Sequence, residues 1–362
     1  MSTPRLETFL RIAADQKASD LHFHAGKVPM VRHDGELLAL PYRVLSELQV
    51  RALLDEILSE DQRAELGDAQ QLDLGYEIPE VGRFRISVCR QYEGLSAVFR
   101  YIPHAIPELS TLNLPSAVSN LTEHANGLVL VTGPTGSGKS TTLASLIDKI
   151  NSTSERHIIT IEDPIEFVHV PKKGLVTQRE VGSHVSSFAA GLRSALREAP
   201  DVLVVGEMRD FDTVHLALAA AEAGVLVFGT LHTGSAAKAI DRILGTCPAD
   251  LQEQVREVLA MLLRGAVSQR LCRLAGGQGR VIAIEVLLQS ISISHLIRED
   301  KIHQIESYLS GGGEGGSGMT SLERSLSRLV AESRVEEEEA LRHANDPDAL
   351  RAMFEKARAA AL

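Results

Sequence analysis

The 362-residue chain contains no tryptophan, and Phe, Trp and Tyr together make up only 4% of it. Sheets that stack RNA bases and clefts that bind sugars need aromatic faces, so both functions are disfavoured. The net charge of -11 also disfavours a surface that holds phosphate backbones by counterion release. We therefore expect no nucleic-acid partner.

Cysteine is scarce, and long apolar runs are missing. Cys89, Cys247 and Cys272 lie far apart, are odd in number and form no CxxC pair, so neither a zinc site nor a redox dithiol is indicated. The first 20 residues carry no signal-peptide core, and no window approaches 18 uncharged apolar residues. These absences predict a reducing, cytoplasmic setting and no direct membrane insertion.

The composition, 44% hydrophobic and 23% charged, is that of a soluble globular protein. At roughly 100–200 residues per domain, the length allows two or three domains. Residues 1–103 predict an α+β domain, with a helix at 4–15, strand-like runs broken by turns at 21–40, a helix at 46–66, and alternating strands at 83–88 and 95–100. Three prolines, Pro103, Pro107 and Pro115, place a linker at 104–116.

Beyond this linker, strands alternate with helices, which predicts a parallel sheet covered by helices over 117–300. The expected strands are 128–132, 157–161, 202–205 and 225–231, followed by a strand pair at about 266–288. Residues 301–362 predict a C-terminal helical segment with a Gly-rich flexible linker at 311–318. The expected fold class is α/β with an added α+β domain.

The decisive motif is Gly133-x-x-x-x-Gly138-Lys139-Ser140, which stands between a buried strand and a helix, as a P-loop requires. The glycines let backbone amides turn toward phosphates, and the helix N-terminus adds partial positive charge. Lys139 is expected to reach the β- and γ-phosphates of ATP, and the Ser140 hydroxyl to bind Mg²⁺. The predicted nucleotide-binding residues are Gly133, Pro134, Thr135, Gly136, Ser137, Gly138, Lys139, Ser140 and Thr141.

Two acidic residues follow predicted strands, at the strand ends where α/β sheets bind their ligands. Glu162 follows the strand at 157–161, and Glu207 comes just after the strand at 202–205. Gly206 stands where a Walker B strand usually ends in Asp, which argues against direct Mg²⁺ binding by this segment. We expect Glu207 to activate the attacking water, with Glu162 as the competing candidate. Ser140 is the first candidate metal ligand, and Glu207 is kept as the second despite this departure.

His232 ends a third strand. A neutral imidazole there could sense the γ-phosphate, but a lone histidine is as often a structural hydrogen-bonder, so both roles are open. Phosphoryl transfer also needs positive charge delivered to the γ-phosphate, and Arg85 and Arg100 of the N-terminal domain are the first candidates. The alternative is that both are ordinary surface arginines on strands.

Four ordered segments resemble the Walker A, Asp box, Walker B and His box of the secretion-type ATPases. They read GPTGSGKST (133–141), TIEDPIEF (160–167), VGEMRD (205–210) and FGTLHT (228–233), and further matches cover most of the chain. Within that superfamily the sequence resembles the retraction ATPases of type IV pili. The pilus-assembly branch usually carries a four-cysteine zinc insert in the C-terminal half, where this chain has only Cys247 and Cys272.

The resemblance implies a homohexamer of two-domain subunits, each with an N-terminal PAS-like domain and a RecA-like core that bind ATP between them. It implies a motor that drives pilus retraction and twitching motility through an inner-membrane platform protein. One departure lies at 292–299, where SISHLIRE replaces the family's AIRNLIRE and Ser294 replaces an arginine. An accessory ATPase paralogue with weak motor activity therefore remains an alternative, and a RecA-like nucleic-acid motor is a less favoured one.

Overall fold

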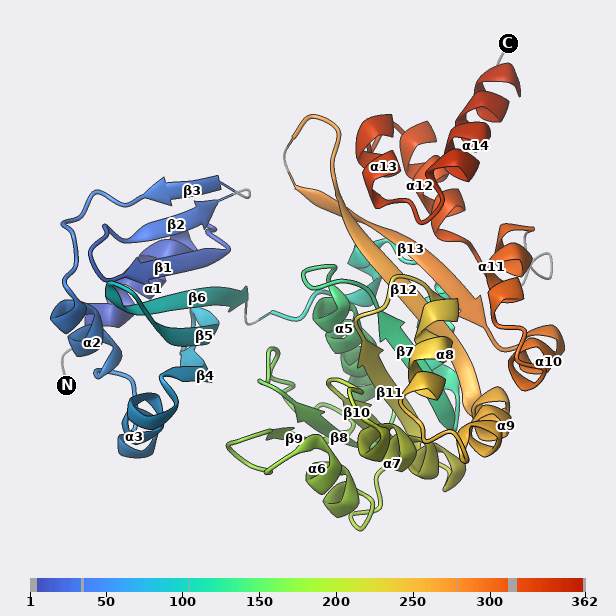
Figure 1. Cartoon of the computed structure of the whole chain (residues 1–362), viewed down its shortest axis with the longest axis horizontal. Helices are drawn as coiled ribbons and strands as arrows, with labels where there is room; N and C mark the ends of the chain where they lie inside the picture. The colour runs from blue at the N-terminus through green and yellow to red at the C-terminus, as the bar shows by residue number, and fades with distance from the viewer. Residues whose placement is uncertain (1–4, 34–35, 104, 278, 312–317, 361–362) are drawn as a thin grey trace. The chain divides into compact units, whose positions relative to one another are not determined.

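The computed structural model describes residues 5–33, 36–103, 105–277, 279–311 and 318–360 (Figure 1). The chain divides into two compact units, each with its own sheet. Unit 1 comprises Met1–Ile106 and Pro164–Val168, and unit 2 comprises Pro107–Asp163 and His169–Leu362. Most of the predicted Gly-rich linker, residues 312–317, lies outside the described residues.

Unit 1 is built on a six-stranded antiparallel sheet in the order β3-β2-β1-β6-β5-β4. Its strands are β1 (Asp20–His24), β2 (Met30–His33), β3 (Glu36–Ala39), β4 (Gln71–Ile78), β5 (Gly82–Gln91) and β6 (Gly94–Pro103). Its helices are α1 (Arg5–Asp15), α2 (Glu47–Leu54) and α3 (Glu60–Ala69). Helix α1 buries Leu6, Leu10 and Ala13, because these positions recur on one face of a helix.

The single helix expected at 46–66 is wrong, since two helices occupy this stretch. Each begins with its own capping box, formed by Ser46 with Gln49 and by Ser59 with Gln62. In each box the serine hydroxyl accepts from the third helical amide, and the glutamine side chain accepts from the serine amide. Ser59 therefore starts a new helix, and the pair Ser59 and Gln62 is the local sequence signal of that start.

Unit 2 is built on a seven-stranded sheet in the order β13-β12-β7-β11-β10-β8-β9. Its strands are β7 (Gly127–Thr132), β8 (His157–Glu162), β9 (Leu175–Glu180), β10 (Val202–Val205), β11 (Leu226–Leu231), β12 (Leu263–Arg273) and β13 (Arg280–Leu288). The paired neighbours from β12 to β9 are parallel, and only β13 is antiparallel to its neighbour. The parallel sheet predicted for this region is confirmed.

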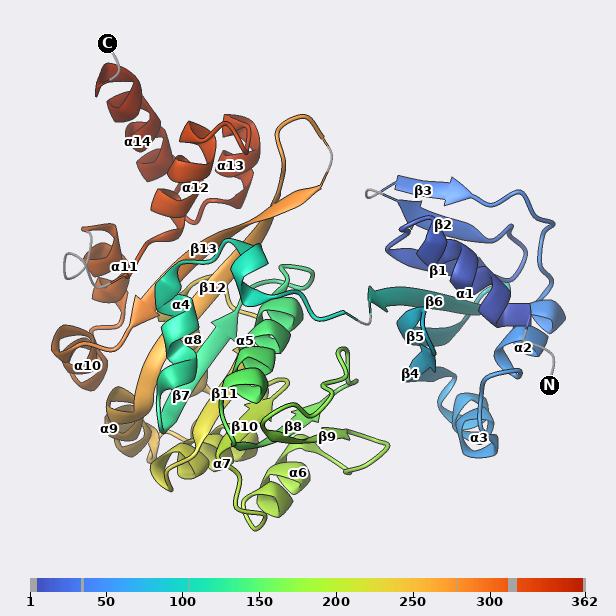
Figure 2. The ribbon, with the colours of Figure 1, turned by 180° about the vertical axis from the view of Figure 1, so that it is seen from behind.

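Helices cover both faces of this sheet. Side chains alternate along β7, so that Leu128 and Leu130 enter one hydrophobic core while Val129 and Val131 enter the other. Figure 2 shows α4 and α5 on one face, and Figure 1 shows α7, α8 and α9 on the other. The bounds of these and the neighbouring helices are α4 (Ser116–Asn120), α5 (Lys139–Thr153), α6 (Phe188–Ala195), α7 (Phe211–Glu222), α8 (Ala236–Gly245), α9 (Gln252–Leu262), α10 (Ile291–Arg298) and α11 (His303–Ser310), with short 3-10 turns at Leu109–Leu112 and Leu121–Glu123.

The last three helices form a small core of their own. They are α12 (Leu322–Ala331), α13 (Glu337–His343) and α14 (Pro347–Ala360). Leu322, Leu326 and Leu329 of α12 are buried together with Cys272 and Val281 of the β12–β13 hairpin. These helices are therefore packed on the sheet of unit 2. None of the helices in the described ranges has the length and apolar character needed to cross a bilayer.

Candidate nucleotide site

The P-loop connects β7 to α5. Gly133, Gly136 and Gly138 have φ angles of +144°, +78° and +87°, which is a backbone conformation that favours glycine. A Cβ atom on Gly133 would lie 2.5 Å from both the Gln269 carbonyl oxygen and the Ser137 Oγ atom. This turn therefore leaves no room for a side chain at Gly133, and it delivers the chain to the first turn of α5 at Lys139.

The Lys139 side chain is buried inside the turn. Its Nζ atom donates to the carbonyl oxygens of Gly133, at 2.7 Å, and Pro134, at 3.1 Å. The same atom lies 3.3 Å from Nδ1 of His232. The positive charge is thus held at the mouth of the loop, beside His232, the residue that follows β11.

The loop has the donor set that a nucleotide phosphate requires. The Ser137 and Thr142 hydroxyls are buried and have no hydrogen-bond partner among the described residues. Ser140 and Thr141 lie in the first turn of α5, whose N-terminal amides have no partner within the helix. Backbone amides, hydroxyls and one ammonium group together fit a polyphosphate, and a hydroxyl in the first turn is a suitable Mg²⁺ ligand.

Strand order brings the four predicted catalytic residues into one row. Lys139 follows β7, His232 follows β11, Glu207 follows β10 and Glu162 ends β8, and these four strands are consecutive in the sheet. Because parallel strands present their carboxyl ends at the same edge, all four residues lie along that edge. The contact distances between Lys139, His232 and Glu207 agree with this order.

The Glu207 carboxylate contacts two basic side chains, Arg209 and His232. Its Oε2 atom accepts from Arg209 Nη2 at 2.6 Å and lies 3.5 Å from His232 Nε2. Partial burial raises the pKa of the Glu207 carboxyl, but the Arg209 hydrogen bond and the nearby His232 outweigh it, so the pKa is lowered overall. Glu207 is therefore a carboxylate at neutral pH, as a water-activating base must be.

Glu162 lies on the neighbouring strand and is held differently. Its Oε1 atom accepts from the Thr160 hydroxyl at 2.7 Å and from Gln178 Nε2 at 3.1 Å. Between the two acids, the Gly206 amide donates to the Ile161 carbonyl at 2.8 Å. A Cβ atom on Gly206 would lie 3.0 Å from that carbonyl oxygen. Close approach of the two strand ends explains why glycine replaces the aspartate that usually ends such a strand.

The predicted arginines Arg85 and Arg100 lie in unit 1. They are directly opposite each other on β5 and β6 and therefore share one face of that sheet. Arg100 Nε donates to Asp20 Oδ1 at 2.9 Å, and Arg85 Nη1 lies 3.9 Å from Glu166 Oε1, also in unit 1. Both arginines thus have acidic partners within their own unit.

Three polar residues around the site were missed by the sequence analysis. Gln269 of β12 is fully buried, and its Nε2 atom donates to the Ser137 carbonyl at 3.0 Å. Arg209 binds Glu207 and Gln178 binds Glu162, as described above. Gln269 carried no local signal, since its neighbours Ser268 and Arg270 are polar as well.

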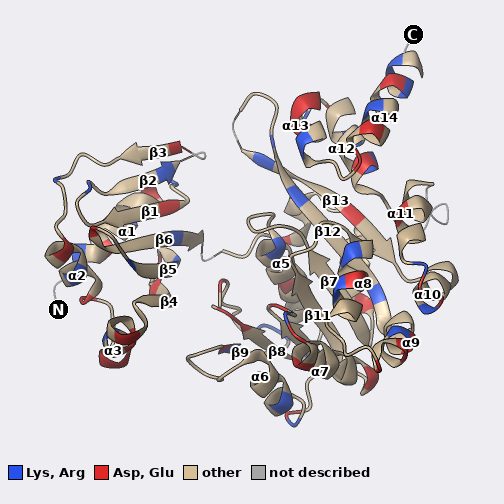
Figure 3. Cartoon of the chain, in the orientation of Figure 1, with Lys and Arg blue, Asp and Glu red and all other residues tan. Residues whose placement is uncertain are grey.

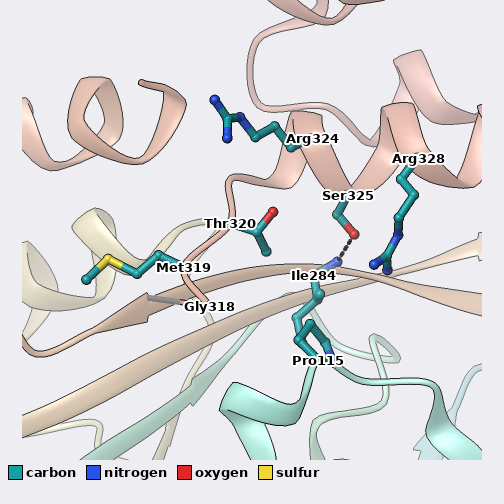
Figure 4. Close-up of a pocket in the computed structure, with 8 residues that line it drawn as sticks. All are labelled: Pro115, Ile284, Gly318, Met319, Thr320, Arg324, Ser325 and Arg328. Atoms are coloured by element: carbon teal, nitrogen blue, oxygen red, sulfur yellow. Dashed lines mark hydrogen bonds between the residues drawn. The ribbon is translucent and has the colours of Figure 1, made fainter. Parts of the chain in front are cut away.

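A cavity of about 320 Å³ opens elsewhere in unit 2 and takes no part in the row of strand ends. Figure 4 shows it between α12 and β13, with Pro115, Ile284 and Met319 among the apolar side chains and Arg324 and Arg328 on the helix. Ser325 of the same helix accepts from the Ile284 amide at 3.0 Å. The cavity is therefore a gap in the packing of the C-terminal helices.

The sheet, the P-loop and the acidic strand ends define a RecA-like P-loop ATPase. A model of the Type II/IV secretion system protein family matches residues 3–359. The type IV pilus retraction ATPase PilT of Pseudomonas aeruginosa (strain PAO1) is 46% identical over 339 residues, which are 94% of this chain and 98% of that protein. A twitching motility protein of Neisseria gonorrhoeae is 45% identical over 322 residues, 89% of this chain and 86% of that protein.

A solved structure agrees with these relatives. The crystal structure of the pilus retraction motor PilT with bound ADP has a TM-score of 0.87 and 45% identity, and the match covers 97% of this chain and 100% of that one. The chain belongs to the Type II/IV secretion system protein family and is an ATPase.

Proposed function

We propose that this protein is a hexameric motor that couples ATP hydrolysis to type IV pilus retraction, and hence to twitching motility. The observation that carries the proposal is the row of Lys139, His232, Glu207 and Glu162 on four neighbouring strand ends. This row occurs in a chain that is 46% identical to a pilus retraction ATPase over nearly its whole length.

In the proposed site, Lys139 and the amides of residues 133–141 bind the phosphates, and Glu207 orients and deprotonates the attacking water. Mg²⁺, held by Ser140, supplies charge neutralisation at the β- and γ-phosphates when bound. Glu207 contacts two basic groups, those of Arg209 and His232. The basic groups keep Glu207 ionised, and this supports its assignment as the base.

We further propose the domain organisation that the sequence indicates, with an N-terminal domain at 1–103, a linker at 104–116, an ATPase core at 117–300 and a helical segment at 301–362. Arg85 and Arg100 share one face of the N-terminal sheet, so both could be delivered together to a γ-phosphate when the domains close. Positive charge at this point is what phosphoryl transfer requires.

The proposed assembly is a ring in which the core of one subunit meets the N-terminal domain of the next. A heterologous contact of this kind closes into a ring when its rotation permits. The ring would act on an inner-membrane pilus platform protein from the cytoplasmic side. Its contact with the membrane would then be made through that partner.

One observation favours the accessory paralogue as the second candidate. Ser294 of α10 is buried, and its hydroxyl donates to the Ala260 carbonyl at 2.8 Å. An arginine at this position could not keep the same packing between α9 and α10. The departure from the family's motif at 292–299 is therefore part of the packed core. Since that motif is associated with retraction in the family that the chain resembles, the departure bears on retraction more than on hydrolysis.

The nucleic-acid motor is less well supported. Figure 3 shows Lys and Arg beside Asp and Glu on helices such as α9 and α14. A phosphate-tracking surface would require a stripe of one sign. ATPase activity measured with and without single-stranded DNA checks this alternative, and a DNA-stimulated rate would favour it.

The decisive experiment is a deletion strain scored for surface pili and twitching motility. If the protein is a retraction motor, the deletion strain should carry more surface pili and lose twitching motility. The wild-type gene should restore motility, and the Lys139→Gln gene should not. Motility that persists in the deletion strain would favour the accessory paralogue. A strain with Ser294→Arg measures how far the motif at 292–299 limits retraction.

The ring has a biochemical test. Light scattering at micromolar protein with ATP and Mg²⁺ should give six times the 39.2 kDa protomer mass. The specific ATPase activity should rise with protein concentration. A monomer with full, concentration-independent turnover would overturn the ring.

A further inference from the structure

The loop after His232 is held by residues from distant parts of unit 2. It runs from Thr233 to Ser235, between β11 and α8. The Gly234 carbonyl accepts from Arg270 Nη2 at 3.0 Å and from Asn345 Nδ2 at 3.3 Å. Two separate side chains therefore fix a backbone group that lies two residues beyond His232.

Arg270 connects this loop to the strand beside the P-loop. It lies on β12, and its Nη1 atom donates to the Gln269 carbonyl at 3.3 Å. The same carbonyl oxygen lies against Gly133, where a Cβ atom would approach to 2.5 Å. A Cβ atom on Gly234 would lie 2.9 Å from Arg270 Nη2. The Arg270 guanidinium group thus lies between the loop that contains Gly234 and the strand residue, Gln269, that packs against the P-loop.

Asn345 brings in the C-terminal helices. It lies between α13 and α14, and its Oδ1 atom accepts from Arg270 Nη2 at 3.4 Å. The backbone amides of Asn345 and Asp346 both donate to Glu323 Oε1 at 3.1 Å. Glu323 is a buried residue of α12. The amide side chain that contacts Gly234 is therefore fixed in place by the packing of the last three helices.

The other side of the loop is anchored as well. The Ser235 hydroxyl donates to Glu306 Oε1 at 3.0 Å, and the Ala236 amide donates to Glu285 Oε1 at 2.7 Å. Ser235 and Glu285 are both buried. A loop bound at Gly234, Ser235 and Ala236 leaves little freedom for the His232 backbone.

We infer that Arg270 and Asn345 are positioning residues for His232, so that helices α12–α14 contribute to the geometry of the ATPase site. The inference rests on the proposed function, in which His232 stands between Lys139 and Glu207. Loss of either side chain weakens the hold on the Gly234 carbonyl, so the loop can shift and the 3.3 Å contact between His232 and Lys139 lengthens. We expect lower kcat with a smaller change in KM, because the P-loop itself keeps its bonds to the phosphates.

A double-mutant cycle tests this role. Asn345→Ala should lower kcat by about 3- to 10-fold, within the range of coupling energies for residues that act through another. In a His232→Ala background, the same change should lower kcat by less than about 2-fold, because its target is already gone. Arg351→Ala is the matched control, since Arg351 is an exposed residue of α14 with an ion pair to Asp348 of its own helix. Arg270→Lys should lie between wild type and Arg270→Ala.

A second readout separates this inference from the proposed function. In ring-labelled histidine NMR spectra, the signal that His232→Ala removes identifies His232. Asn345→Ala should shift that signal, and Arg351→Ala should leave it in place, whether or not the wild type retracts pili or hydrolyses ATP. An unmoved His232 signal, or kcat losses that simply multiply in the double variant, would overturn the positioning role.

Discussion

His232 Nδ1 lies 3.3 Å from Lys139 Nζ, although the two residues are 93 positions apart in the sequence. The other ring nitrogen, Nε2, lies 3.5 Å from Glu207 Oε2. An imidazole that carries its hydrogen on Nε2 satisfies both contacts, since Nδ1 then accepts from the ammonium group and Nε2 donates to the carboxylate. One ring thus joins Lys139, the proposed phosphate-binding lysine, to the proposed base.

The first prediction concerns Lys139. Lys139→Gln should lower the ATPase rate by at least about 10²-fold. A positive charge that is already in place beside the phosphates is a large part of phosphoryl-transfer catalysis, and this variant removes it. Steady-state phosphate release by the purified protein measures the effect. Lys149→Gln, on the same helix, is the control, and a Lys139 variant with near wild-type turnover would refute the P-loop assignment.

The second prediction separates the two acids. Glu207→Ala should bind ATP with near wild-type affinity yet hydrolyse it about 10²- to 10⁴-fold more slowly, as expected when a general base is lost. Glu162→Ala should lower the hydrolysis rate less than Glu207→Ala does. Glu222→Ala, a change at an exposed residue at the end of α7, should leave the rate unchanged. Single-turnover hydrolysis and nucleotide titration measure both quantities. A larger loss for Glu162 than for Glu207 would move the base to β8.

The third prediction concerns the paired arginines of unit 1. Arg85→Ala and Arg100→Ala should each lower kcat more than ATP affinity, because the proposed role of both residues is to bring positive charge to the γ-phosphate. Arg5→Ala, an exposed change in α1, is the control. Arg100 also pairs with the buried Asp20, so the Tm of each variant is measured alongside its kinetics. Unchanged kcat in both folded variants would remove the N-terminal domain from the chemistry.

The fourth prediction is a pH dependence of stability that comes from Glu285. Burial raises the pKa of this carboxyl from 4.5 to about 7, against the opposing hydrogen bond from the Ala236 amide. The folded state therefore favours the protonated form, and its stability falls as the pH rises from about 4.5 through 7. Glu285→Gln cannot ionise, so this variant should lose less stability over that range.

Thermal unfolding of wild type and Glu285→Gln at pH 5 and pH 8 measures this effect. For a unit of this size, each kcal/mol corresponds to about 2–4 °C in Tm, so the difference should be several degrees. The Tm values of the two proteins should differ least at pH 5. At pH 8 the variant should have the higher Tm. Parallel pH profiles would show that Glu285 titrates normally.

The parts of the fold that could be predicted were those with a strong local signal. β7, β10 and β11 are continuous apolar runs because both faces of the sheet are covered, and the P-loop motif follows directly from β7. β9 was missed, because it is an edge strand with the mixed sequence LVTQRE and only half-buried side chains over most of its length. β4 was also missed, although buried and exposed residues alternate along its first half as they do along β5, which was predicted.

The residues of the candidate site could be named one by one, but their neighbours could not. Nothing local in the sequence shows that β11 inserts between β7 and β10, and this order alone brings His232 between Lys139 and Glu207. The bonds of Gln269 to Ser137 and of Asn345 to Gly234 join segments more than 100 residues apart. Long-range contacts of this kind depend on how the layers pack, so the structure was needed to find them.

The strand order also determines when the protein can acquire its activity during synthesis. β7 and the P-loop are made early. The two strands that flank β7 come much later, since β11 begins at Leu226 and β12 begins at Leu263. A nascent chain that ends before Leu226 therefore has a phosphate-binding motif on a strand with no partner on either side. On the ribosome, at roughly 5–20 residues per second, nucleotide capture must wait several seconds after the motif itself emerges.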